Sequence, residues 1–149
     1  TDINNPYMRM AYDFAKSLYK QTKWNSKTTP VAVIVNRKNQ VEVVKATANG
    51  AHVLERHCDR LGKAGTPYYN CKNCKEDKHA ERIALESIKH KDIKGGSIYL
   101  YGHYKMCDSC ILALQERGIK KFYLLKDSNV LFDRHNENSV IGKTEQFVL

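Results

Sequence analysis

Two short motifs constrain the fold of this chain most. The first runs from His79 to Glu81 and the second from Cys107 to Cys110, each at the start of an expected helix. Cys107 and Cys110 are three positions apart, so both thiols lie on one helical face and can bind one ion, with His79 as a third ligand. Thiolate and imidazole ligands favour zinc, and the positive ends of two helix dipoles favour the thiolates. We therefore expect a Zn²⁺ site where the two helices begin.

Hydrophobic spacing predicts the other helices and strands. The expected helices cover 7–19, 78–90 and 107–117, and the expected strands cover 31–35, 41–44, 98–101 and 121–125. The first two strands are expected to form a hairpin. This order predicts an α/β sandwich around a mixed sheet. The tail from Lys126 to Leu149 is expected to pack back as a last strand or as a short helix.

Length and composition predict one soluble domain over residues 1–149. The chain is 42% apolar and 28% charged, which is enough to bury one core. It has no apolar run of membrane-spanning length and no signal-peptide pattern in its first ten residues, so we expect a cytoplasmic protein that binds no membrane. Its 25 basic residues outnumber 16 acidic ones by 9 but are spread along the chain, which favours an anionic partner only weakly.

The segment at about 51–78 is expected to be an insertion that needs its own stabilisation, because it lacks a long periodic pattern. The odd cysteine count and the two-residue gap between paired cysteines favour metal ligation over disulfides. One hypothesis is a second, structural zinc, with ligands from Cys58, Cys71, Cys74 and either His57 or His52. The alternatives are free thiols in a reducing cytosol and, less favoured, a redox-active cysteine pair.

Glu81 has a different predicted role from the ligands. It stands two residues after His79, and residues two apart do not share a helical face, so we expect it to flank the ion's open position rather than to bind the ion. Three protein ligands plus a water are typical of catalytic zinc, which lowers the pKa of that water to about 7. Glu81 would then move the protons. The alternatives are a purely structural zinc site and residues at helix starts that bind no metal.

These motifs resemble the zinc-dependent cytidine and deoxycytidylate deaminase superfamily, over about residues 30–125. The matching segments are the strand from Pro30 to Val35, Asn49 after the second strand, the helix start at 78–81, and the strand and loop at 100–107. His-x-Glu followed by Cys-x-x-Cys is the signature of zinc nucleobase deaminases. Two positions depart from the family pattern. Met106 stands where proline usually precedes the first cysteine, and His103 where threonine is common.

The resemblance implies a three-layer α/β/α sandwich around a mixed five-stranded sheet. It also implies a zinc-dependent hydrolase in which zinc hydroxide attacks C4 of a cytosine nucleotide, with Glu81 as the proton shuttle. Asn49, Ala80 and His103 are the implied substrate contacts. The 30 positions between Asn49 and His79 are similar to the deoxycytidylate (dCMP) deaminases, so dCMP to dUMP is the leading reaction, and a homo-oligomer is expected.

Two other functions stay open at this point. Deamination of RNA or single-stranded DNA is the first, motivated by the net charge of +9 and by Tyr68, Tyr69 and Tyr104. A non-catalytic zinc-stabilised binding module is the second. Weakly indicated contacts for a nucleotide phosphate are Ser26, Lys27, Arg56 and Arg60.

Overall fold

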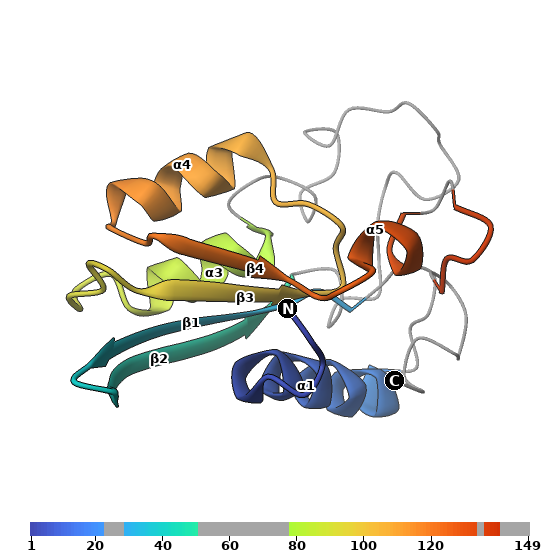
Figure 1. Ribbon diagram of the computed structural model, residues 1–149, viewed down its shortest axis with the longest axis horizontal. Helices are drawn as coiled ribbons and strands as arrows, with labels where there is room; N and C mark the ends of the chain where they lie inside the picture. Colours follow the sequence, from blue (N-terminus) through green and yellow to red (C-terminus); the bar gives the residue numbers. More distant parts are fainter. Residues whose placement is uncertain (23–28, 51–77, 134–135, 141–149) are drawn as a thin grey trace.

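The sheet is mixed and has four strands among the described residues. The structure, a computed structural model, describes residues 1–22, 29–50, 78–133 and 136–140. The strands are β1 (Val31–Lys38), β2 (Val41–Asn49), β3 (Ser97–Tyr101) and β4 (Lys121–Leu124), in the spatial order β2-β1-β3-β4. β1 pairs antiparallel with β2 and with β3, and β3 pairs parallel with β4 (Figure 1).

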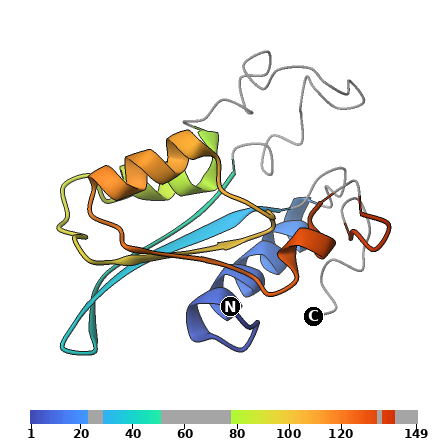
Figure 2. The same ribbon diagram turned by 45° about the horizontal axis from the view of Figure 1, so that its top comes forward.

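Helices cover both faces of this sheet, which confirms the three predicted layers. Helix α1 (Pro6–Thr22) lies on one face, while α3 (Ala80–Ser87) and α4 (Asp108–Glu116) lie on the other (Figure 2). A short helix, α5 (Ser128–Leu131), follows β4. The described part of the chain contains four strands rather than five, and the end of the tail, 141–149, lies outside the described residues.

The central strand β1 explains the two cores. Side chains alternate between the faces of a strand, so Val31, Val33 and Val35 pack in the core on the side of α1, whereas Ala32 and Ile34 pack on the side of α3 and α4. All five are at most 3% exposed. A strand that is buried on both faces has an unbroken apolar sequence, which is the pattern that predicts it.

The predicted hairpin is confirmed, but its strands are longer than expected. Its two turn residues, Asn39 and Gln40, both have positive φ, 53° and 65°. Lys38 pairs directly with Val41, so only two residues connect the strands. Two successive positive φ angles match the right-handed twist of paired strands and allow the pairing to continue to the turn.

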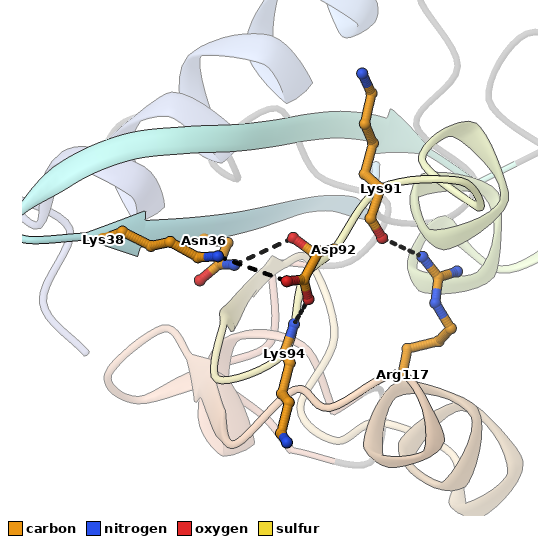
Figure 3. Close-up of polar contacts among 6 residues, drawn as sticks. All are labelled: Asn36, Lys38, Lys91, Asp92, Lys94 and Arg117. Atoms are coloured by element: carbon orange, nitrogen blue, oxygen red, sulfur yellow. Dashed lines mark hydrogen bonds and ion pairs between the residues drawn. The ribbon is translucent and has the colours of Figure 1, made fainter.

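Helix α3 is shorter than the helix predicted over 78–90. The chain after α3 forms a loop that is held at several points. The Arg117 guanidinium, just after α4, donates hydrogen bonds to the carbonyl of Ile88 at 2.9 Å and to that of Lys91 at 3.2 Å. Figure 3 shows the bond to Lys91. The Asn36 side chain donates to the carbonyl of Asp92 at 3.2 Å. These bonds tie the C-terminal ends of α3 and α4 to each other and to β1.

None of the helices in the described ranges is both long and apolar enough to cross a membrane.

Candidate metal centre

His79 and Cys107 occupy equivalent positions in the fold, each one residue before a helix. Their backbone angles nearly coincide, with φ −72° and ψ 150° at His79 and φ −70° and ψ 153° at Cys107. Each carbonyl accepts the first hydrogen bond of its helix at 3.0 Å, from Ile83 and from Ile111. Neither side chain caps its helix, so both are available as ligands. The predicted helix starts are thus confirmed.

The three predicted ligands converge on one point. Nδ1 of His79 lies 3.6 Å from Sγ of Cys107 and 3.6 Å from Sγ of Cys110, and the three ligand atoms all lie within 4.8 Å of one another. With zinc bonds of about 2.05 Å to nitrogen and 2.3 Å to sulfur, the edge of a tetrahedron joining the two atoms is about 3.6 Å. The spacing of these atoms therefore fits a tetrahedral zinc site.

The charges of the site also favour a cation. Burial raises the pKa of the Cys110 thiol far above its usual range, and a hydrogen bond with Cys107 and the charge of Glu81 raise it further. A buried thiolate beside a second sulfur and a carboxylate is unfavourable until a positive ion balances them. A bound metal dication reverses this effect and deprotonates the coordinating thiol.

Glu81 is buried beside these ligands but is not one of the converging atoms. Its side chain is 1% exposed, and its Oε1 has no hydrogen-bond partner among the residues that the structure describes. A buried carboxylate oxygen without a partner is costly, and this one can accept a hydrogen bond from a ligand or a water at the site. That Glu81 flanks the ion's open position stays a prediction.

Ser109 is a neighbour of the site that the sequence interpretation missed. Its hydroxyl lies 3.5 Å from Sγ of Cys107, within reach of a hydrogen bond to sulfur. Once Cys107 is a thiolate, the hydroxyl is the only donor of this pair. A hydroxyl two residues after a ligating cysteine is the signal that could have found it, because both side chains start in the first turn of α4.

The other predicted contacts lie at separate points around this end of the sheet. Ala80 is fully buried as the first residue of α3, and His103 is half-buried in the loop between β3 and α4. Asn49 ends β2, and its side-chain amide donates to the carbonyl of Gly50 at 2.9 Å. Asn49 and the last residue of β3, Tyr101, both pair with Val31, so β2 and β3 end at the same level. Substrate contact by Asn49, Ala80 and His103 stays a prediction.

Other predicted groups lie outside the described residues. They are the ligands of the hypothetical second zinc and the weakly indicated phosphate contacts: His52, His57, Cys58, Cys71, Cys74, Ser26, Lys27, Arg56 and Arg60.

The fold and the ligand atoms together define a zinc-binding α/β protein whose zinc is held by one histidine and two cysteines. The sequence profile of the cytidine and deoxycytidylate deaminase zinc-binding region matches residues 2–126. The chain therefore belongs to this family, and the predicted family and zinc site are confirmed. Members of this family are zinc-dependent hydrolases of the deaminase type, which is the class of enzyme that the sequence predicted.

Solved structures with related folds share little sequence with the chain. A diaminohydroxyphosphoribosylaminopyrimidine deaminase/5-amino-6-(5-phosphoribosylamino)uracil reductase from Thermotoga maritima is 20% identical, with a TM-score of 0.41, over 79% of this chain and 28% of its own length. The dCMP deaminase of cyanophage S-TIM5, in complex with dCMP and dUMP, is 18% identical, with a TM-score of 0.46, over 80% of this chain and 82% of its own. No curated protein sequence matches the chain significantly.

Proposed function

We propose that the protein catalyses the hydrolytic deamination of a cytosine nucleotide, with dCMP to dUMP as the leading reaction. One observation carries the proposal. A buried carboxylate, Glu81, has an oxygen with no hydrogen-bond partner within the described part of the chain, beside three atoms spaced as zinc ligands. A purely structural zinc site has no use for such a carboxylate, whereas a hydrolytic site needs a group that accepts and returns a proton.

The chemistry divides between the metal and this carboxylate. Zinc bound by His79, Cys107 and Cys110 supplies a Lewis acid that makes water nucleophilic near neutral pH. Glu81 accepts a proton from the water that attacks C4 of the base, and delivers it to N3. Glu81 then carries the proton of the new C4 hydroxyl to the amino group as the C4–N bond breaks, so cytosine and water become uracil and ammonia. Burial of Glu81 strengthens these interactions, because little water competes for its oxygens.

The remaining predicted contacts orient the nucleotide in this proposal. Asn49 holds the sugar at the end of β2, and Ala80 and His103 border the base. A mononucleotide is favoured over a strand because the 30 positions between Asn49 and His79 resemble the dCMP deaminases. A second zinc in the insertion at about 51–78 and self-association of the chain both stay predictions.

A base within RNA or single-stranded DNA is the second candidate substrate, and one part of the surface favours it. Tyr104, in the loop before Cys107, is 42% exposed, and Nζ of the neighbouring Lys105 lies 6.0 Å from its ring centroid. An exposed ring stacks on a nucleobase and a lysine contacts phosphate, which is how sequence-tolerant single-strand binding works. The net charge of +9 also favours binding to the phosphates of a nucleic acid.

Ammonia release from a panel of substrates tests these alternatives. The panel contains dCMP, CMP, the two nucleosides, free cytosine and a short cytosine-containing single strand. We expect the highest kcat/KM for dCMP, and no turnover by Glu81→Ala although it retains zinc. Turnover of the strand alone, weakening steeply with salt, would replace the mononucleotide with a nucleic acid. An active Glu81→Ala protein would contradict the mechanism, and zinc-loaded protein inert on every substrate would support the binding module.

A further inference from the structure

The loop that delivers Cys107 to the zinc site begins at a closely packed glycine. Gly102 directly follows β3, is buried, and has a φ of +98°. A Cβ at this position would lie 2.9 Å from the Cα of Pro30 and 3.0 Å from the carbonyl oxygen of Thr29. Both are backbone atoms, and carbon atoms in contact are normally about 3.5–4.0 Å apart. Only glycine fits this conformation and this approach without a shift of the backbone.

The segment against which Gly102 packs is itself fixed. Thr29 is 1% exposed, and Pro30 immediately precedes β1. The carbonyl of Pro30 accepts a hydrogen bond of 3.1 Å from the amide of Gly50, the residue after Asn49. The start of β1 therefore connects the segment that carries Asn49 to the one that leads to Cys107. The atoms that a Cβ at Gly102 would meet are backbone atoms of this segment rather than the ends of flexible side chains.

The other end of the loop is anchored by packing. Met106, the residue before Cys107, is 7% exposed and belongs to the core between the sheet and helices α3 and α4. Between the two anchors, Tyr104 and Lys105 are exposed. The backbone contact of Gly102 and the burial of Met106 therefore both restrain the position of Cys107.

We propose that Gly102 is a positioning residue of the zinc site, which acts through the loop 102–106 to place Sγ of Cys107 at its 3.6 Å distance from His79. The inference rests on the zinc site and deepens the proposed function without depending on which nucleotide is deaminated. A displacement of Cys107 by a fraction of an ångström weakens zinc binding, because zinc accepts only a narrow range of bond lengths.

A comparison of Gly102→Ala with Gly118→Ala separates positioning from general destabilisation. Gly118 has a φ of +93°, and a Cβ there would lie 2.7 Å from the Cα of Lys94, so the two substitutions introduce similar strain. Gly118, however, follows the far end of α4, away from Cys107. Both variants should have melting temperatures several degrees lower than the parent.

The readout is binding of Co²⁺ in place of Zn²⁺, followed by its d–d absorption bands. A Cys110→Ser chain titrated in parallel isolates the signal of this centre from any other cysteine site. Gly102→Ala should weaken binding about tenfold or more, as loss of support around metal ligands does, and should shift the bands. Gly118→Ala should stay within about threefold and keep the parental spectrum. Parental binding in Gly102→Ala, or equal weakening in both variants, would overturn the proposal.

A measurement on the unmodified chain keeps the proposal testable if Gly102→Ala does not fold. Because coupling is reciprocal, metal at Cys107 must stabilise the segment that positions it. Zinc should therefore slow hydrogen exchange of the Gly50 amide, bonded to Pro30, more than that of the Gly95 amide, which donates to the Gly118 carbonyl at 2.7 Å. Equal slowing at both amides would overturn the inference. Because neither readout involves substrate, failure of the proposed deamination would leave both results standing.

Discussion

Replacement of Glu81 by methionine should make the zinc-free protein more stable and the zinc-loaded protein inactive. Methionine has about the size and helix propensity of glutamate but has no oxygen to leave unpartnered. Glu81 is 1% exposed, and its Oε1 finds no partner in the described ranges; leaving such a buried group unsatisfied costs about 1–3 kcal/mol. For 149 residues the entropy of unfolding is about 0.3 kcal/mol per kelvin, so Tm should rise by about 3–10 °C.

Thermal unfolding of the two chains in a chelating buffer measures this difference, and ammonia release after zinc loading measures activity. Glu86→Met is the matched control, because Glu86 lies on the same helix but is exposed, with an ion pair of 3.2 Å to Lys89. Its stability should stay within about 0.5 kcal/mol of the parent, and its activity should be unchanged. A Glu81→Met chain less stable than the parent would refute the reasoning, because the carboxylate would then support the fold rather than burden it.

Two further predictions concern the zinc ligands and the pH dependence of the fold. Cys110→Ser should lower the zinc content by one ion per chain, as measured by elemental analysis. Asp108→Asn, at the exposed start of α4, should not change the zinc content. Full zinc content in Cys110→Ser would show that Cys110 is not a ligand. Burial, and to a smaller extent Tyr12, raises the pKa of the Tyr101 hydroxyl, so folding favours its protonated form. The free energy of unfolding should therefore fall as the pH rises above about 10, the ordinary tyrosine pKa. Denaturant titrations at pH 8 and 10.5 should show a smaller fall in Tyr101→Phe than in the parent, and an equal fall would contradict the prediction.

The zinc ligands could be predicted from sequence because their chemistry is local. His79 and Cys107 each start a helix, and Cys110 follows Cys107 by three residues. The pattern of ligands therefore specifies two helix starts that must meet. The apolar run from Val31 to Val35 likewise predicts a buried strand, because its composition and its burial have the same cause.

The features that sequence did not reveal depend on contacts between distant segments. No sequence motif around Gly102 marks it as a residue that must be glycine. Its role follows from its close approach to Pro30, 72 residues earlier in the chain. The loop after α3 is held by Arg117, 29 and 26 residues away in the chain, whose guanidinium bonds to the carbonyls of Ile88 and Lys91. The length of the hairpin strands depends on positive φ at Gln40, a residue type that seldom adopts it.

Helices α3 and α4 are joined at both ends, and only one of the two connections requires metal. Their N-terminal ends meet through His79, Cys107 and Cys110, whereas Arg117 connects their C-terminal ends by hydrogen bonds. The core beneath them consists of apolar side chains, which pack without a metal. Removal of zinc should therefore leave the sheet and the C-terminal connection in place, and loosen the helix starts and the segment around Gly102, Pro30 and Gly50 that positions Cys107. The protein can therefore keep the buried carboxylate of Glu81, because the apolar core offsets the free-energy cost of burying this group.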